Sequence, residues 1–413
     1  MARFYIEWHG CSLNKADAEK LRHALVSAGH ALVDSPDNAD YCIINTCAVK
    51  SPTEEKIIER LKKLGELAIR KNLKLIAIGC LVEINPERIK KVAPQALLFG
   101  VEPEELGAYL GVKLDYSPSA PSLPYNDCIS IIPVSRGCLN QCSYCCVRIV
   151  RGRLKSNNPD DIDNAFANAI KRSREIWLTA TDLACYGFDI GTNICELLKR
   201  LLKNPGDYRI RLGMLNPQHV KRYFDELLQV MEDKRIYKFF HLPVQSGSDE
   251  VLKKMARGYS SADFEALVEK VRKKFPDAVI ATDIIVGFPG ETQADFEKTI
   301  DLLKRVKPDV VNVSRYSKRP KTNISERMIQ SETVKERSRV VSKIVKEIAL
   351  QRNKEFIGRE LSVLLSEKGI KGGLLGRTDS YKPVVVDSNA ACSFIRVKIT
   401  DAKATHLVGI PVE

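Results

Sequence analysis

Four cysteines fall within nine residues of the stretch SRGCLNQCSYCCVRIV, residues 135–150. Cys138, Cys142 and Cys145 form a C-x3-C-x2-C pattern. Structural zinc usually takes four ligands, often as two C-x2-C pairs, and the sequence has no second pair nearby. Three thiolates instead suit a four-iron, four-sulfur cube in which one iron has no protein ligand. Cys146 does not match this spacing, so we expect it to pack as a small apolar residue.

Three further cysteines, Cys11, Cys47 and Cys80, each stand at the C-terminal end of a predicted strand. Ligands bind at the carboxyl ends of the strands in an open parallel sheet, so these thiols are expected to converge. The pattern predicts a second three-thiolate site, although any one of these residues alone would more often be a buried core cysteine. We expect the remaining cysteines to serve packing: Cys42, Cys128, Cys185, Cys195 and Cys392.

The strands that carry the second set belong to a strand–helix alternation in residues 1–114, with helical stretches at 14–28 and 53–70. The apolar runs of this region lie at 3–10, 41–47, 73–80 and 96–100. Such alternation predicts the α/β class and a parallel sheet covered on both faces. Residues 115–127, DYSPSAPSLPYND, are rich in Ser and Pro and are predicted to form a linker.

The C-x3-C-x2-C loop follows the first strand of a second series in residues 128–350. Its predicted strands cover 130–136, 175–182, 208–215, 238–244, 278–288 and 310–317. Six strand–helix repeats are two short of a complete eight-fold barrel, which predicts an open, partial (β/α)6 barrel. A long basic helix is expected from 333 to about 356. Residues 351–413 are predicted to form a small all-β barrel, a type that often contacts nucleic acid.

The chain is basic, with 65 Lys and Arg against 52 Asp and Glu, a net charge of +13. Residues 301–413 hold 23 basic against 13 acidic residues, whereas 101–300 hold 27 of each. This excess favours a polyanionic partner such as nucleic acid, with a generally basic solvated surface as the alternative. No run of about 18 apolar residues and no secretory pattern is present, so we expect a cytoplasmic protein without a membrane partner. In that reducing compartment, clustered cysteines indicate metal or catalytic sites rather than disulfides.

The cysteine spacing, with Tyr144 before the third cysteine and a partial barrel around it, resembles the radical S-adenosylmethionine superfamily. Motifs in all three predicted domains are similar to the methylthiotransferases. Those of the first domain are GCSLNKAD (10–17), NTCAV (45–49) and GCL (79–81). Those of the second are HLPVQSGSDEVLKKMARGY (241–259), TDIIVGFPGET (282–292) and RYSKRP (315–320). GRTDSYKPVVV (376–386) resembles the RNA-binding TRAM barrel, and RLGMLNP (211–217) resembles the archaeal and eukaryotic branch.

This resemblance implies an enzyme that attaches a methylthio group to C2 of N6-threonylcarbamoyladenosine, next to the anticodon of tRNA. It implies two [4Fe-4S] clusters. The cluster on Cys138, Cys142 and Cys145 would cleave S-adenosylmethionine to a radical, and the cluster on Cys11, Cys47 and Cys80 would hold the sulfur that is transferred. The implied partners are the tRNA anticodon loop, an electron donor and a sulfur donor. The implied cofactor contacts, for which a scaffold role is the alternative, are Tyr144, Gly213, Met214, Gln245, Ile285, Val286 and Gly287.

Basic residues of the later motifs are candidate phosphate contacts: Arg319, Lys321, Arg377, Lys382, Arg396 and Lys398. Two positions depart from the family pattern, since Thr181 stands where Gln is common and Lys321 where Gly is usual. His241 is either a core histidine or a site residue. Three alternative functions stay open: methylthiolation of isopentenyladenosine, an iron–sulfur RNA-binding or sulfur-carrier protein without radical chemistry, and a zinc-bearing RNA-binding module.

Overall fold

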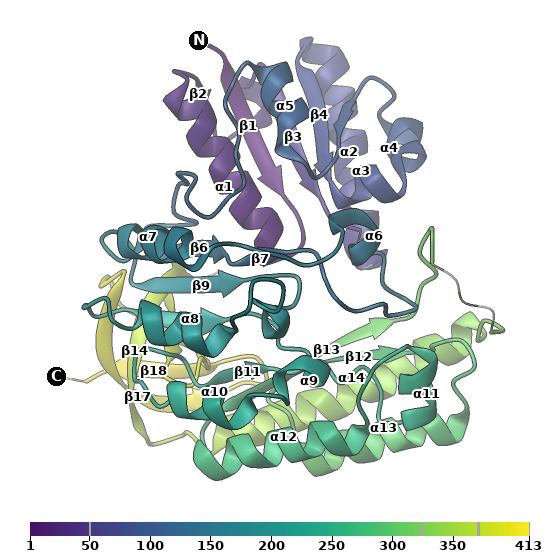
Figure 1. The fold of residues 1–413 in the computed structure, drawn as a ribbon, viewed down its shortest axis with the longest axis vertical. Coiled ribbons are helices and arrows are strands. Elements are labelled where there is room, and N and C mark those ends of the chain that lie inside the picture. Colours follow the sequence, from purple (N-terminus) through teal and green to yellow (C-terminus); the bar gives the residue numbers. More distant parts are fainter. Residues whose placement is uncertain (49–50, 323, 325, 370–371, 413) are drawn as a thin grey trace.

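The computed structural model describes all residues except 49–50, 323, 325, 370–371 and 413, and the side chains of 51 and 52. Figure 1 shows three parts: an N-terminal sheet with its helices at the top, a larger strand–helix unit below it, and a small β-barrel in yellow at the left. The predicted fold class, a parallel α/β sheet, a partial (β/α)6 barrel and a small all-β barrel, is confirmed.

The N-terminal sheet has five parallel strands in the order β2-β1-β3-β4-β5. They are β1 (Arg3–Trp8), β2 (Ala31–Leu32), β3 (Tyr41–Thr46), β4 (Lys74–Gly79) and β5 (Leu97–Phe99). The helices are α1 (Ser12–Ser27), α2 (Ser51–Lys71), α3 (Cys80–Ile84), α4 (Pro86–Val92) and α5 (Pro103–Leu110). Leu61 of α2 packs in one core, and Leu21 of α1 and Leu106 of α5 pack in another. Helices therefore cover both faces, which explains why β3 and β4 are apolar almost throughout.

The central unit has six strands in two three-stranded sheets, β10-β9-β6 and β11-β12-β13. They are β6 (Ile129–Pro133), β9 (Glu175–Thr179), β10 (Arg209–Leu212), β11 (Phe239–His241), β12 (Val279–Val286) and β13 (Val310–Arg315). Two isolated parallel bridges connect the sheet that ends in β10 with the sheet that begins at β11: Ile210 with Ile236 and Met214 with His241. In the described chain no pairing joins β6 to β13, so the barrel is open.

Helices follow the barrel strands and pack around one large core. They are α7 (Pro159–Ala169), α8 (Ile194–Leu201), α9 (Pro217–Val220), α10 (Phe224–Val230), α11 (Asp249–Lys254), α12 (Ser261–Lys274), α13 (Gln293–Val306) and α14 (Ser331–Lys354). Capping boxes start two of them, Ser260 with Asp263 at α12 and Thr292 with Asp295 at α13. Between β6 and α7 the chain forms the ribbon β7 (Ser135–Arg136) and β8 (Lys155–Ser156), with α6 (Val147–Arg151) between its two strands.

The C-terminal part is a closed five-stranded barrel in the order β14-β15-β16-β18-β17. Its strands are β14 (Glu360–Lys368), β15 (Leu374–Thr378), β16 (Pro383–Val386), β17 (Ser393–Ala402) and β18 (Leu407–Pro411). Tyr381 packs on Tyr237 and Phe239, and its hydroxyl donates to Glu175, the first residue of β9. The small barrel therefore docks at the N-terminal ends of the central strands, away from the cysteine loop (Figure 1).

Candidate active site

The first cysteine set lies in the loop between β7 and α6, at the carboxyl end of β6. Cys138, Cys142 and Cys145 are partly buried, and burial raises the pKa of Cys145 to about 12. Cys142 and Cys138 raise the same pKa further, because a second thiolate nearby disfavours ionisation. The structure therefore brings the three thiols close together, as the spacing predicts.

Hydrogen-bond donors surround this set. Asn140 directs its backbone N–H and its side-chain Nδ2 to Cys138 Sγ, each at 3.4 Å. Asp182 and His219 hold the Asn140 side chain at 3.1 and 3.0 Å. From the barrel, Arg257 Nη1 donates to Cys142 Sγ at 3.3 Å. Such donors orient sulfur ligands and tune the metal group that they bind.

The second set lies where three neighbouring strands end. Cys11 follows β1, Cys47 follows β3, and Cys80 begins α3 directly after β4. Cys47 Sγ packs so closely on Gly10 that a Cβ there would lie 2.6 Å from it, and Gly10 has a φ of +102°. Only glycine fits this approach. Burial raises the pKa of Cys80, and Cys11 adds to the shift, so these two thiols are also neighbours.

Both sets contain thiols only, which suits an iron–sulfur cube. Among the described residues, no three His, Cys, Asp or Glu side chains are arranged around a point that would hold a single metal ion. A cube binds each thiolate through a different iron, so its ligands stand further apart than the ligands of one zinc ion. The donor chemistry of each set fits a [4Fe-4S] cluster.

Cys146 belongs to neither set in its packing. It is 3% exposed, lies in the core of the N-terminal domain, and directs its Sγ to the Ala48 carbonyl at 3.7 Å. The prediction that it packs as an apolar residue agrees with this burial, but its surroundings come from the other domain.

The two domains also meet through a pair of hydroxyl groups. Ser12 of α1 and Thr179 of β9 join their hydroxyls at 2.5 Å. The carboxyl ends of both parallel sheets therefore meet at one interface.

A cavity of about 740 Å³ opens beside the first set. Six of the predicted site residues line it: Tyr144, Cys145, Gln245, Ile285, Gly287 and the candidate phosphate contact Arg319. Gln245 has a φ of +73°, a conformation that is uncommon outside glycine and frequent at functional sites. Gly287 has a φ of +75°, and a Cβ there would lie 2.5 Å from Val334 of α14, so its backbone forms the wall directly.

The other predicted cofactor contacts, Gly213, Met214 and Val286, are not among the described residues that line the cavity. The Gly213 N–H donates to the Leu178 carbonyl, and Met214 pairs with His241. Their cofactor contact stays a prediction. His241 Nε2 lies 2.8 Å from an oxygen of Asp283, which also lines the cavity.

Of the two family departures, Thr181 has a buried hydroxyl with no hydrogen-bond partner among the described residues. Lys321 is exposed, its Nζ donates to the Glu83 carbonyl at 3.3 Å, and its φ is +64°. The left-handed backbone explains why glycine is usual at this position in the family.

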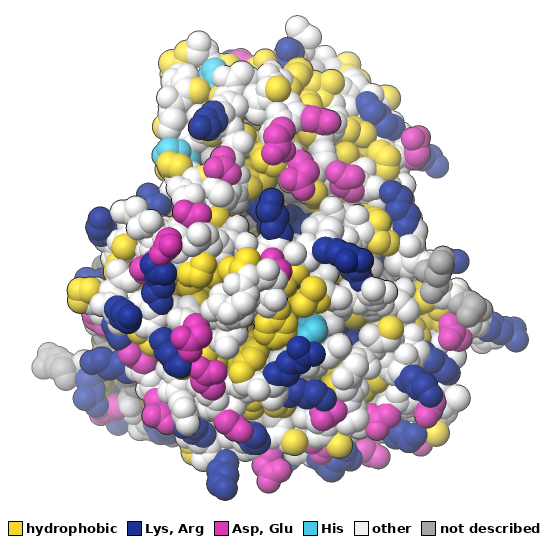
Figure 2. All heavy atoms as spheres, viewed as in Figure 1, with side chains coloured by type: hydrophobic (Ala, Val, Ile, Leu, Met, Phe, Trp, Pro, Cys, Tyr) yellow, Lys and Arg dark blue, Asp and Glu magenta, His cyan; other side chains and the backbone are white. Residues whose placement is uncertain are grey.

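The candidate phosphate contacts fall into two groups. Arg396 and Lys398 on β17 are exposed, like Lys321, and Arg396 also forms a surface ion pair with Glu360 at 3.0 Å. In contrast, Arg319 pairs with Glu54 at 2.5 Å, Arg377 with Glu367 at 3.2 Å, and Lys382 with Asp309 at 2.8 Å, the last with 2% of its side chain exposed. A phosphate contact by these three stays a prediction, and each would have to compete with a carboxylate. On the face shown in Figure 2, Lys and Arg side chains are interspersed with acidic ones rather than gathered in one patch.

Comparison with known proteins identifies the class. Residues 132–303 match the radical SAM superfamily, 3–100 match "Uncharacterized protein family UPF0004", and 354–412 match the TRAM domain. The radical S-adenosylmethionine methyltransferase TsrM of Kitasatospora setae shares the fold, with a TM-score of 0.56 and 13% identity over 76% of this chain and 73% of its own. The fold and the cysteine loop define a radical S-adenosylmethionine protein, a class that implies this cofactor and a [4Fe-4S] cluster.

Full-length relatives narrow the class. A probable threonylcarbamoyladenosine tRNA methylthiotransferase of Pyrococcus abyssi is 40% identical over 99% of both chains. A protein of the same name from Methanothermobacter thermautotrophicus is 40% identical over 98% of this chain and 99% of its own. The chain belongs to the family of threonylcarbamoyladenosine tRNA methylthiotransferases. None of the helices in the described chain is long and apolar enough to cross a membrane.

Sequence reasoning missed two residues that contact the first set. Arg257 lies within the quoted ARGY stretch and Asn140 within the cysteine loop itself. The sequence signal that could have found these two residues is their position inside the motifs. The direction of their side chains toward sulfur required the tertiary structure.

Proposed function

We propose that this chain transfers a methylthio group to C2 of N6-threonylcarbamoyladenosine next to the anticodon of tRNA, giving 2-methylthio-N6-threonylcarbamoyladenosine. The observation that carries the proposal is the pair of three-cysteine sets, each at the carboxyl ends of parallel strands, at one interface between two domains. The names of the full-length relatives support the substrate.

Cys138, Cys142 and Cys145 would hold the cluster that supplies an electron to cleave S-adenosylmethionine. Asn140 and Arg257 donate hydrogen bonds to this set. Tyr144, Gln245, Ile285 and Gly287 form the neighbouring wall, where they would bind the cofactor's adenosine and exclude water. The family resemblance alone supports three further contacts with the cofactor: Gly213, Met214 and Val286.

Cys11, Cys47 and Cys80 would hold a second [4Fe-4S] cluster, which presents the sulfur for transfer. The burial of Cys47 and Cys80, at 4% and 5% exposure, supports this role because it limits the access of water and oxidants. The target C2–H is not acidic near neutral pH, so acid–base catalysis alone would not remove it. This requirement supports a radical site beside a sulfur site.

The C-terminal barrel would bind the tRNA anticodon region, with Arg396, Lys398 and Lys321 as exposed phosphate contacts. The target base would leave its stack in the loop to reach the interface. An electron donor and a sulfur donor complete the reaction. The same proposal includes a cytoplasmic location beside the tRNA pool. It also includes three domains, at 1–114, 128–350 and 351–413, with a linker at 115–127.

The test is nucleoside mass spectrometry of host tRNA with and without the gene, together with iron and sulfide analysis of protein purified without oxygen. We expect 2-methylthio-N6-threonylcarbamoyladenosine to disappear when the gene is absent, and the protein to hold eight irons, four for each cluster. Loss of a methylthiolated isopentenyladenosine instead would favour the other tRNA substrate. Iron without S-adenosylmethionine cleavage would indicate a sulfur carrier, and zinc in place of iron would contradict the proposal.

A further inference from the structure

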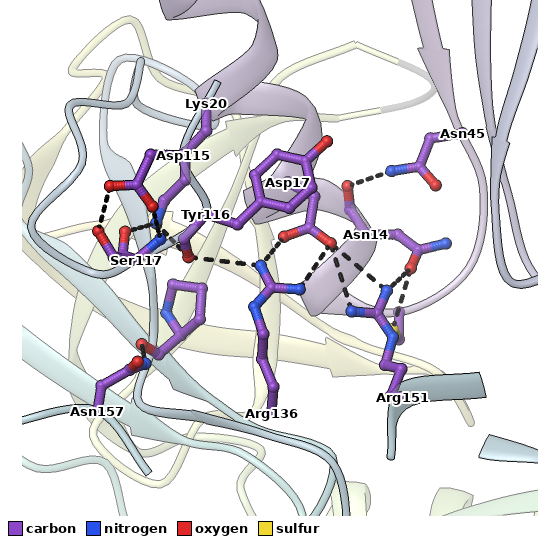
Figure 3. Close-up of polar contacts among 12 residues, drawn as sticks. Asn14, Asp17, Lys20, Asn45, Asp115, Tyr116, Ser117, Arg136, Arg151 and Asn157 are labelled. Atoms are coloured by element: carbon purple, nitrogen blue, oxygen red, sulfur yellow. Dashed lines mark hydrogen bonds and ion pairs between the residues drawn. The ribbon is translucent and has the colours of Figure 1, made fainter. Parts of the chain in front are cut away.

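Helix α6 carries an arginine whose side chain leaves the barrel unit and enters the N-terminal domain. Arg151 ends this helix, six residues after Cys145, and only 4% of its side chain is exposed. Its Nη2 donates to Asn14 Oδ1 at 2.8 Å, and both terminal nitrogens lie 3.4 Å from Asp17 Oδ2 (Figure 3). Two residues of α1 therefore fix the guanidinium in place.

The same guanidinium lies beside the second cysteine set. Asn14 Oδ1, which accepts from Arg151, is 3.8 Å from Cys11 Sγ. Burial raises the pKa of Cys80, and Arg151 counters part of that shift through its charge and a hydrogen bond. Burial disfavours the charge on Arg151, but Asp17, Cys80 and Cys11 more than offset it and raise its pKa. A permanent positive charge thus borders two of the three thiols.

Arg136 of β7 provides an internal comparison. It binds Asp17 Oδ1 from the opposite side, and it continues to the Tyr116 carbonyl and ring rather than to a cysteine (Figure 3). Both arginines come from the barrel unit and share one carboxylate of α1. Arg136 continues to Tyr116, whereas Arg151 continues to the second cysteine set.

The charges of this cluster do not balance without the thiols. Lys20 donates to the carbonyls of Tyr116 and Ser117, and burial lowers its pKa to about 8, so its charge is not counted here. The carboxylate of Asp17 pairs with two guanidinium groups that stay charged, Arg136 and Arg151. An unpaired positive charge is costly in a buried place. The second positive charge lies on the Arg151 side, where Cys11 and Cys80 stand.

We infer that Arg151 is a positioning residue of the second cysteine site, contributed by the barrel unit across the domain interface. Its guanidinium holds a positive charge against the metal-bound thiolates of Cys11 and Cys80 and stabilises the reduced, more negative state of that group. The inference rests on the proposed second cluster. One short segment carries Cys145 of the first set, Cys146, and Arg151 beside the second set. This segment therefore connects the two cysteine sets physically.

The test measures a reduction potential in the full-length protein. Cys138, Cys142 and Cys145 are replaced together by Ala, so that any remaining cluster belongs to the second set. Arg151→Met, Arg151→Lys and Arg136→Met are compared in this parent after anaerobic reconstitution, by redox titration followed with electron paramagnetic resonance. We expect Arg151→Met to lower the ratio of reduced to oxidised cluster at a fixed potential at least tenfold, which is about 59 mV for a one-electron couple.

Arg151→Lys keeps the charge and should recover most of this loss, while Arg136→Met should change the ratio far less. Equal shifts in the two Met variants would overturn the inference, because they would assign the effect to Asp17 and the domain interface. Iron lost only in Arg151→Met, at an unchanged unfolding temperature, supports the inference, whereas equal iron loss in both overturns it. A parent without any cluster would contradict the proposed second cluster, and a bound cluster with an unshifted potential would overturn the role of Arg151 alone.

Discussion

Arg257 Nη1 donates a hydrogen bond to Cys142 Sγ over 3.3 Å. The rest of the guanidinium is held by Tyr259 Oη at 2.8 Å and by Asn216 Oδ1 and the Pro243 carbonyl, each at 3.2 Å. These contacts aim one N–H at the sulfur. Preorganised donors of this kind orient a ligand and set the electronic properties of the bound group.

Replacing Arg257 by Lys is expected to slow 5′-deoxyadenosine formation about 10- to 100-fold, the usual effect of losing such a supporting contact. Lysine keeps the charge but lacks the planar fork that reaches all four acceptors at once. The rate is measured under reduction with S-adenosylmethionine in excess. Arg222→Lys is the matched control, because Arg222 is an exposed arginine of the same domain that stacks on Phe188. An unchanged rate in Arg257→Lys would remove the contact from the mechanism.

Cys145→Ala is expected to abolish 5′-deoxyadenosine formation, while Cys146→Ala should keep most of it. Cys145 completes the spacing of the first set, whereas Cys146 falls outside that spacing and packs in the core of the N-terminal domain, although both border the cavity. Loss of the buried Cys146 sulfur should cost about 1 kcal/mol of unfolding free energy. Iron content and thermal unfolding are measured on both variants. Equal loss of 5′-deoxyadenosine in two well-folded variants would show that Cys146 also contributes.

Replacing Cys11, Cys47 and Cys80 together by Ala should stop methylthiolation of tRNA but preserve the cleavage of S-adenosylmethionine. The two sets stand in domains with separate hydrophobic cores, so each should survive loss of the other. Products are followed by nucleoside and small-molecule mass spectrometry. Continued methylthiolation would disprove the sulfur-delivery role. A folded variant that keeps its first cluster but cannot cleave the cofactor would show coupling through the 145–151 segment.

The double change Arg396→Ser and Lys398→Ser is expected to weaken tRNA binding and to reduce its salt dependence. Each lost phosphate contact should lower the slope of log K against log salt by about 1. Point changes are preferable to deletion of the C-terminal barrel, because Tyr381 and Lys382 bury themselves against the central unit. Arg359→Ser, which removes a surface pair with Asp277, is the control. Binding that is equal to the control at two salt concentrations would exclude this strand from the RNA interface.

Spacing along the chain was sufficient to predict the six-strand barrel and to group six cysteines into two sets, whose role as cluster ligands stays a prediction. A loop at the end of a parallel strand brings its residues to one edge of the sheet whatever the rest of the fold does, so the sequence alone groups Cys11, Cys47 and Cys80. The alternation of strands and helices can likewise be predicted from the sequence, because the hydrophobic period of each segment is set by its own residues.

The partners of the charged side chains were decided only by the tertiary structure. Arg319, Arg377 and Lys382 are basic residues in motifs, and their types suit phosphate, yet the fold places a carboxylate against each of them. Glu54 and Asp309 come from another domain, and Glu367 comes from the neighbouring strand of the same barrel. Arg151 likewise meets Asp17 and the second cysteine set only because α6 lies against the N-terminal domain, where it contacts α3. A charge is equally compatible with solvent, phosphate or a buried carboxylate, and contacts between distant residues, such as Arg319 with Glu54 or Arg151 with Asp17, leave no period in the sequence.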